Sequence, residues 1–244
     1  MTAPTRVVSG LALPEETVQA VDGLEAAGVL AFTTTRAFGT FGIGGTDPVG
    51  DVMGRWQRLQ EGIGASRFAT SRQVHAADIV EHLPGWEGWL RGTAGADGHL
   101  SLTPGTAMAV TIADCVPVFV VHPRGASALL HSGWRGTEAG ITTRAVARLA
   151  EAGFPAEELT VAVGPAICGA CYEVSAEVYG RLTGRAVETP TTVDLRAIIA
   201  DQARAAGVRR IVESEWCTRH HNDRFFSHRA GDAGRQLGVL MVRE

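Results

Sequence analysis

Two histidines and one cysteine stand at the ends of predicted strands in this sequence. His75 and His131 end strand-like stretches, and Cys115 ends the stretch Thr111 to Cys115. Neighbouring strand ends can meet at one edge of a sheet, where sites are commonly built. Two imidazoles and a thiolate are a known catalytic zinc set with one open position. The same residues could instead be packed core residues, or a cysteine nucleophile with a histidine base, oriented by Asp97 or Asp114.

A glycine-rich turn follows His131. Gly133 and Gly136 flank Arg135 just before a predicted helix that Thr137 can cap. Backbone N–H groups at a helix start, together with a guanidinium group, can bind an anion. The alternative is an ordinary tight turn that carries a surface arginine.

The remaining three cysteines give a weaker signal. Cys168 and Cys171 have the spacing of a redox pair or of half a zinc ribbon, but the sequence holds no second C-x-x-C. We interpret both as structural cysteines. Cys217 is uninformative by itself, and we expect His220 and His221 to be loop residues.

Composition excludes several classes of protein. The chain has 244 residues, with 22 basic and 26 acidic side chains and a net charge of −4, which argues against nucleic-acid binding. Every basic residue is arginine, so Schiff-base, pyridoxal phosphate and P-loop lysine chemistry is excluded. No apolar run is long enough for a membrane span, and we see no signal peptide. Four cysteines do not suggest a disulfide framework, so we expect a cytoplasmic protein.

The elements that must position these residues indicate a mixed α/β class, because strands alternate with a few helices. Apolar patterning predicts strands over 29–34, 68–75, 108–112, 116–121, 126–131, 159–163, 208–212 and 237–242. Short turns between several of them require some antiparallel pairing. Capping residues predict helices that begin at Asp47-Pro48, at Thr137 and at Asp194.

Taken together, several motifs resemble the YfiH-type laccase-domain family, and the match runs in order from about Phe32 to the C-terminus. The blocks that carry the resemblance are Gln73-Val74-His75, Ala96-Asp97-Gly98, Thr111 to Pro117, His131 to Gly136, Gly164-Pro165, Cys171 to Val174, Cys217-Thr218 and Phe225 to Arg229. Any single block would be weak, whereas their combination is specific.

The resemblance implies one domain over residues 1–244 with a variable N-terminal extension over 1–28. The implied fold is a four-layer αββα sandwich of mixed sheets, similar to certain cysteine-hydrolase-like toxins. The resemblance also implies Zn²⁺ bound at His75, Cys115 and His131. Members of the family are said to cleave adenosine, inosine, guanosine and methylthioadenosine with phosphate, and to deaminate adenosine. Some members have instead been assigned to peptidoglycan editing on a UDP-muramoyl-serine precursor, and the family name suggests a copper-dependent polyphenol oxidase.

We therefore expect a zinc-dependent purine nucleoside phosphorylase with Arg36 and Arg135 as phosphate clamps and Asp97 assisting proton transfer. The expected partners are a purine nucleoside and phosphate, with no nucleic acid or membrane, and the expected state is a monomer or weak homodimer. A four-copper site is improbable because no two histidines are spaced as H-x-H, although a His₂Cys set can bind copper. A cell-wall amidase and a non-catalytic metal-binding module are the competing hypotheses.

One segment departs from the family pattern. The family usually has a Ser-x-Asn-Leu-Gly stretch after the Thr-Arg motif, whereas this chain has the shorter Thr40 to Gly44, and Gly54 replaces a second asparagine. The missing polar side chains would line the substrate side, so this departure affects the expected specificity.

Overall fold

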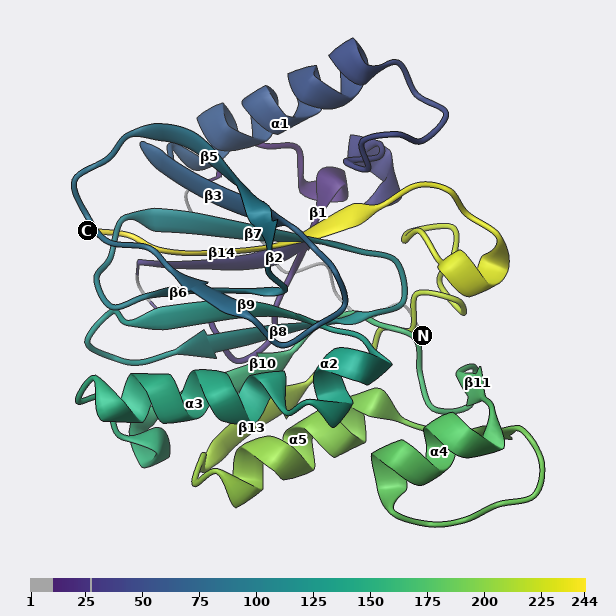
Figure 1. Cartoon of the computed structure of the whole chain (residues 1–244). Coiled ribbons are helices and arrows are strands. Elements are labelled where there is room, and N and C mark those ends of the chain that lie inside the picture. The colour runs from purple at the N-terminus through teal and green to yellow at the C-terminus, as the bar shows by residue number, and fades with distance from the viewer. Residues whose placement is uncertain (1–10, 27) are drawn as a thin grey trace.

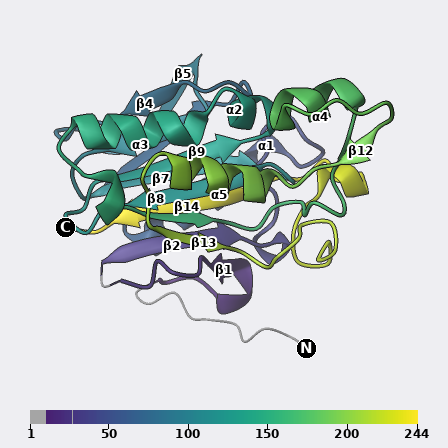
Figure 2. The ribbon, with the colours of Figure 1, turned by 90° about the horizontal axis from the view of Figure 1, so that it is seen from below.

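The computed structural model describes residues 11–26 and 28–244, and it consists of two six-stranded sheets packed face to face. Helices cover the outer face of each sheet, so four layers follow one another through the molecule (Figures 1 and 2). This arrangement confirms the predicted αββα sandwich with mixed sheets.

The first sheet has the strand order β1-β2-β14-β7-β3-β5. Its strands are β1 (Val18–Ala20), β2 (Val29–Thr34), β14 (Gln236–Val242), β7 (Thr106–Ile112), β3 (Arg67–Arg72) and β5 (Gly88–Gly95). Strand β14 pairs antiparallel with both β2 and β7, whereas β3 pairs parallel with β7 and β5. The C-terminal strand therefore lies inside the sheet beside strands from much earlier in the chain.

The second sheet has the strand order β13-β10-β8-β9-β6-β4. Its strands are β13 (Arg210–Glu213), β10 (Thr160–Val163), β8 (Val116–Val121), β9 (Ser127–Ser132), β6 (Gly98–Ser101) and β4 (Ile79–Glu81). Every residue of β8 and β9 is buried. Burial on both faces explains why β8 reads as a continuous apolar run instead of an alternating one.

Helix α1 (Val49–Ile63) covers the first sheet, and α3 (Ile141–Glu151) and α5 (Leu195–Ala205) cover the second (Figure 1). The short α2 (Trp134–Glu138) precedes α3, and α4 (Ala176–Thr183) lies beside the small ladder of β11 (Glu173–Val174) and β12 (Thr191–Thr192). The 3₁₀ turns are η1 (Glu15–Thr17), η2 (Arg36–Phe38), η3 (Ala156–Glu158) and η4 (His228–Ala230). In the described part of the chain, no helix is both long and apolar enough to cross a membrane.

Three apolar layers hold the sandwich together. Trp56 and Leu59 of α1 pack on the first sheet, Phe119 and Leu240 lie in the layer between the sheets, and Ile199 of α5 packs on the second sheet. Burial of such large apolar side chains is the main source of stability in a fold of this kind. The strand ends are thereby fixed relative to one another, as a site shared by both sheets requires.

The eight predicted strands all exist; two have the predicted bounds, and the bounds of the other six shift by at most three residues. The predicted start of the middle helix was wrong, because Thr137 lies inside α2 and α3 begins after Gly140. Gly140 has a φ of 70°, in the left-handed region that glycine adopts most easily. Asp194 does cap α5, accepting from the backbone N–H groups of Arg196 and Ala197. Strands β1, β4, β5, β6, β11 and β12 and helix α4 were not predicted.

The predicted N-terminal extension falls partly on residues 1–10 and 27, which lie outside the described residues. Within the described part, β1 pairs antiparallel with β2 at the edge of the first sheet. The boundary at residue 28 stays a prediction.

Candidate functional site

His75, Cys115 and His131 meet where the two sheets end together, and we call them the His₂Cys site. His75 follows β3 of the first sheet, His131 belongs to β9 of the second, and Cys115 lies in the turn from β7 to β8 that passes from one sheet to the other. One nitrogen of each imidazole and the sulfur lie within 4.8 Å of one another. The imidazole ring centroids are 4.8 Å apart and the rings are nearly perpendicular. The expectation that one sheet edge would gather these residues was wrong, because both sheets contribute.

The carboxylate of Asp97 holds the two imidazole-bearing segments in place. Its Oδ1 accepts from the backbone N–H of His75 at 3.0 Å and from Nδ1 of His131 at 2.8 Å. Its Oδ2 accepts from the backbone N–H groups of Val74 at 3.0 Å and Ala76 at 2.8 Å. Asp97 is fully buried, and His75 has a positive φ of 59°, a conformation that these bonds help to maintain.

Glycines allow the turn after β9 to approach the His₂Cys site. A Cβ atom at Gly133 would lie 2.9 Å from Sγ of Cys115 and 3.4 Å from Cδ2 of His75. A Cβ atom at Gly136 would lie 3.1 Å from the backbone oxygen of Ala76. The two glycines at positions 133 and 136 therefore allow close packing around the site.

Asp114, next to Cys115, fixes the turn between the sheets. It has a φ of 85°, and its Oδ1 accepts from Oγ1 of Thr218 at 2.6 Å. Its Oδ2 accepts from the backbone N–H of Arg229 at 2.7 Å. The segment after β13 is thus joined directly to the turn that carries the cysteine.

Without a metal ion, Cys115 and His131 form a thiolate–imidazolium pair. Burial acts to raise the pKa of Cys115, but the charge of His131 and hydrogen bonds from His131 and His75 outweigh it and lower the pKa to about 6. Burial acts to lower the pKa of His131, but the Cys115 thiolate and the bond to Asp97 raise it to about 9. Near neutral pH the site therefore holds a reactive thiolate.

In metal-free protein we expect alkylation of Cys115 by iodoacetamide to accelerate through pH 6, because the lowered pKa of about 6 makes the thiol ionise there. Mass spectrometry of the peptide that contains Cys115 separates this reaction from that of the remaining cysteines. Bound Zn²⁺ should suppress the reaction. A midpoint near the pKa of a free thiol, about 8.5, would contradict the ion pair.

The donor set fits a zinc ion. Two imidazole nitrogens and one thiolate match known catalytic zinc sites. The bond from Nδ1 of His131 to Asp97 follows the carboxylate–histidine pattern that orients metal ligands. A second group of side chains, Cys168, Cys171, Cys217 and His220, could also hold a metal ion.

A cavity of about 500 Å³ opens beside the His₂Cys site, and all three of its residues line it. One wall of this cavity is aromatic, since Trp56 and Trp89 stack with ring centroids 5.3 Å apart. This size lies in the ordinary range for small-molecule sites. The potential metal ligands thus face a space that can hold an aromatic ligand.

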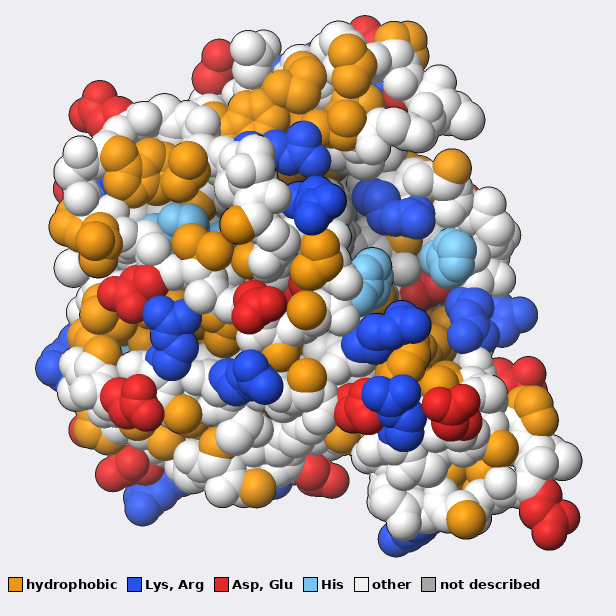
Figure 3. Space-filling view, in the orientation of Figure 1, with side chains coloured by type: hydrophobic (Ala, Val, Ile, Leu, Met, Phe, Trp, Pro, Cys, Tyr) orange, Lys and Arg blue, Asp and Glu red, His pale blue; other side chains and the backbone are white. Residues whose placement is uncertain are grey.

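Cationic side chains line another part of the cavity. Arg72, Arg91, Arg235 and His228 contribute to it. Arginine and histidine side chains gather around a hollow in the surface in Figure 3. Within the described residues, the guanidinium groups of Arg72 and Arg91 have no hydrogen-bond or ion-pair partner. They remain available to an anionic ligand.

The two arginines singled out in the sequence do not line this cavity. The guanidinium of Arg36 donates to the carboxylate of Asp232 at 2.7 Å and lies over the ring of Phe226. The guanidinium of Arg135 lies 4.3 Å from the ring centroid of Trp134. Their role as phosphate clamps stays a prediction, and the lining arginines are better placed for it. Arg72 stands directly before the Gln73-Val74-His75 motif, which was the available sequence signal.

The segment that departs from the family pattern lies partly at the cavity. Phe41, Gly42 and Ile43 line it, and the expectation that this segment affects specificity stays a prediction. Gly54 belongs to α1 and does not line it. The departure therefore makes this wall apolar instead of amide-bearing.

The sequence model of the family described as multi-copper polyphenol oxidoreductase laccase matches residues 34–243. The chain belongs to this family. It is 34% identical over 192 residues to a purine nucleoside phosphorylase of Streptomyces coelicolor, covering 74% of this chain and 77% of that protein. It is 37% identical over 219 residues to a purine nucleoside phosphorylase of Mycobacterium tuberculosis, covering 81% and 85%. It is 32% identical over 249 residues to adenosine deaminase RL5 of an unknown prokaryotic organism, covering 87% and 90%.

Solved structures of family members share the fold. YlmD of Geobacillus stearothermophilus superposes with a TM-score of 0.84 at 28% identity, covering 96% of this chain and 99% of that one. YfiH of Bacillus licheniformis superposes with a TM-score of 0.84 at 20% identity, covering 96% and 100%, which supports the fold alone. The resemblance noted in the sequence is confirmed, and the names of the relatives support an enzyme.

Proposed function

We propose that this chain is a zinc-dependent purine nucleoside phosphorylase of broad specificity with an adenosine deaminase side activity. The observation that carries the proposal is one cavity that combines the His₂Cys site, an aromatic wall and unpaired arginines. A nucleoside needs a flat apolar surface for its base, and phosphate needs cationic donors. Relatives named purine nucleoside phosphorylase and adenosine deaminase favour the same reactions.

In this proposal, His75, Cys115 and His131 hold Zn²⁺, which when bound supplies a Lewis acid for a phosphate oxygen or a water molecule. Arg72 and Arg91 bind phosphate through charge-assisted hydrogen bonds. Their guanidinium groups hold the anion in a fixed orientation near the sugar of the bound nucleoside. Positioning of this kind removes much of the entropic barrier to attack on the anomeric carbon.

The aromatic wall would bind the purine. The indole Nε1 of Trp89 donates to Oγ1 of Thr70 at 3.2 Å, which fixes the ring against Trp56. Gln73 joins the first sheet to the site, since its Oε1 accepts from the backbone N–H of Thr111 at 2.7 Å. These bonds keep the wall and the metal ligands in register.

Asp97 was expected to assist proton transfer, and that role stays a prediction. Its two oxygens already accept four hydrogen bonds, so its contacts favour positioning of the imidazoles. Burial acts to raise its pKa, but the bonds from His131 and Ala76 outweigh it and lower the pKa. A carboxylate in this state stays ionised and supports the charge of His131.

The function is tested with zinc-loaded protein incubated with adenosine, inosine, guanosine or methylthioadenosine, with and without phosphate. We expect release of free base and pentose 1-phosphate only when phosphate is present, and slow formation of inosine from adenosine. Absence of base release with all four nucleosides, or release that is independent of phosphate, would overturn the proposal. Hydrolysis of UDP-muramoyl-serine would indicate the amidase, and copper-dependent phenol oxidation would indicate the laccase activity.

Arg72→Gln and Arg91→Gln should each raise the KM for phosphate roughly tenfold or more, because a charge-assisted hydrogen bond contributes about 1.5–3 kcal/mol. The KM for the nucleoside should change little. Arg209→Gln is the matched control, since Arg209 is exposed and does not line the cavity. An unchanged KM for phosphate in both cavity variants would remove these arginines from the anion site.

A further inference from the structure

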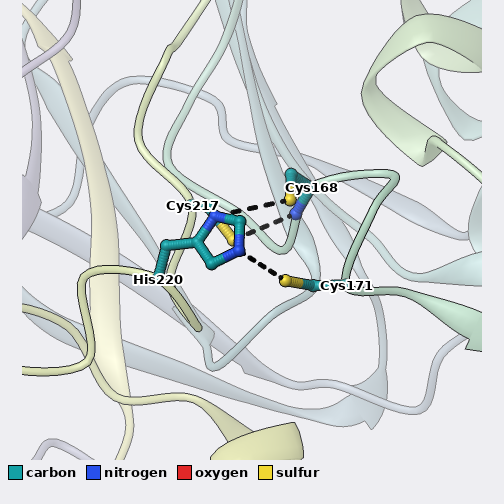
Figure 4. Close-up of side chains that lie close together, drawn as sticks. All are labelled: Cys168, Cys171, Cys217 and His220. Carbon is teal, nitrogen blue, oxygen red and sulfur yellow. Dashed lines mark hydrogen bonds between the residues drawn. The ribbon is translucent and has the colours of Figure 1, made fainter.

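A second group of metal-binding side chains lies outside the cavity. We call it the Cys₃His cluster, and its members are Cys168, Cys171, Cys217 and His220. One potential ligand atom from each residue lies within 4.8 Å of the others, and the four side chains converge on one point (Figure 4). All four cysteines of the chain are free thiols, so no disulfide accounts for this convergence.

The cluster joins two segments that are distant in the sequence. Cys168 and Cys171 lie in the turn that follows β10, and Cys217 and His220 lie after β13. An isolated bridge between Ala166 and Cys217 aligns the two segments as a parallel pair. The fold therefore brings a C-x-x-C pair against a C-x-x-H pair.

The potential ligand atoms are close enough to surround one metal ion. Sγ of Cys171 lies 3.1 Å from Nε2 of His220, and Sγ of Cys168 lies 3.9 Å from Nδ1 of the same ring. In a tetrahedral zinc site with Zn–S bonds of about 2.3 Å and a Zn–N bond of about 2.0 Å, sulfur and nitrogen atoms are roughly 3.5 Å apart. Because one ion binds a single ring nitrogen, the imidazole of His220 must rotate so that the same nitrogen faces all three sulfur atoms.

A backbone donor faces the sulfur of Cys217. The backbone N–H of Cys168 donates to Sγ of Cys217 at 3.3 Å. Outer hydrogen bonds of this type are a regular feature of metal–thiolate sites. Three crowded thiols with one imidazole form a donor set for which zinc is a preferred ion.

We propose that the Cys₃His cluster binds one structural Zn²⁺ ion, separate from the ion proposed for the His₂Cys site. Four protein ligands fill the tetrahedron and leave no position for substrate, which is typical of structural zinc. The thiol protons are released to solvent as the ion binds. This ion takes no part in the reaction proposed above.

The structural effect of this ion reaches the cavity wall. Thr218, next to Cys217, donates to Asp114, and Arg229 of the same segment donates to the second oxygen of Asp114. His228 of this segment lines the cavity. A metal that ties the segment to the turn after β10 would therefore brace the turn that carries Cys115.

The test counts zinc ions per chain in protein expressed with supplemented zinc, using elemental analysis and native mass spectrometry. We expect two ions in the wild type and one in Cys115→Ala. The double variant Cys115→Ala/Cys171→Ser should hold none. Native mass spectrometry of the wild type gives the number of zinc ions per chain without any substitution, so the proposal can be tested even if a variant fails to fold.

His220→Ala and His221→Ala form a matched pair, because His221 is adjacent in sequence but outside the cluster. In a Cys115→Ala background, His220→Ala should weaken zinc binding at least tenfold, whereas His221→Ala should retain it. With Co²⁺ in place of Zn²⁺, Cys115→Ala should show the strong sulfur-to-cobalt absorption of three thiolates, and Cys171→Ser should reduce it by about a third.

Three results would overturn the proposal. The first is Cys115→Ala protein that holds no metal, and the second is an equal metal content in Cys115→Ala and Cys115→Ala/Cys171→Ser. The third is a Cys168–Cys171 disulfide in the purified protein. None of these readouts uses nucleoside turnover. Failure of the structural zinc is therefore distinct from failure of the phosphorylase activity.

Discussion

Cys115→Ala should lose the metal of the His₂Cys site and reduce phosphorolysis by about 1,000-fold or more. The thiolate is the only anionic donor in this site, and its removal leaves two imidazoles that bind zinc weakly. Metal analysis and steady-state kinetics on the same preparation measure both effects. The zinc of the Cys₃His cluster should remain and acts as an internal reference.

Cys115→Asp separates the metal mechanism from a cysteine nucleophile. The carboxylate keeps an anionic ligand but has no sulfur, so a metal enzyme should recover part of the lost activity when zinc is supplied. A nucleophilic enzyme should stay as inactive as Cys115→Ala. The arrangement of Asp97, His131 and Cys115 also resembles a nucleophile triad, which makes this comparison necessary. Activity retained by metal-free Cys115→Ala would contradict both mechanisms.

Asp97→Asn should be the most damaging isosteric change near the site. All four groups that contact the carboxylate are donors, so one amide N–H₂ must face donors in either orientation. We expect a loss of roughly 2–4 kcal/mol in the free energy of unfolding, because buried donors lose their acceptor. Metal affinity should fall about 10- to 100-fold, as is usual when the outer partner of a ligating histidine is removed.

Asp78→Asn is the control for this change, since Asp78 is an exposed aspartate three residues after His75. Chemical denaturation and zinc competition titrations measure the two effects. Equal behaviour of both variants would show that Asp97 does not organise the site.

The contribution of Asp97 should also depend on pH. Its pKa in the folded protein is lowered below the ordinary value of 3.8, since hydrogen bonds outweigh the effect of burial. The stabilisation by the Asp97 carboxylate is then fully present above pH 3.8, and it is lost as the pH falls through the lower pKa that Asp97 has in the folded protein. The difference in unfolding free energy between wild type and Asp97→Asn should therefore shrink in strong acid.

The sequence indicated much of the fold because its signals are local. The apolar run over 116–121 and the mainly apolar stretch over 126–131 predicted strands, and both are fully buried. Asp194 predicted a cap that the structure confirms. The start predicted at Thr137 was wrong because Thr137 lies inside the short helix α2. Gly140, in the left-handed conformation, then separates α2 from α3, and no clear signal in the sequence marked this break.

The outer elements escaped prediction for a physical reason. Strand β5 has only exposed and half-buried positions, so its sequence lacks the apolar alternation that marks a strand. Helix α4 has no fully buried residue. Such elements form because tertiary pairing and packing stabilise them, and local propensity contributes little.

By itself, the sequence determined the chemical types in the site: two imidazoles, one thiolate, a carboxylate and guanidinium groups in place of lysines. The tertiary structure decided which of them act together. The ends of both sheets meet at the His₂Cys site, and Asp97 there accepts from four donors. The fold also brings Arg72 and Arg91 to the cavity. It places the Cys168-x-x-Cys171 pair against the Cys217-x-x-His220 pair. These contacts join residues far apart in the chain, and residue spacing carries information only about neighbours within a turn or a strand.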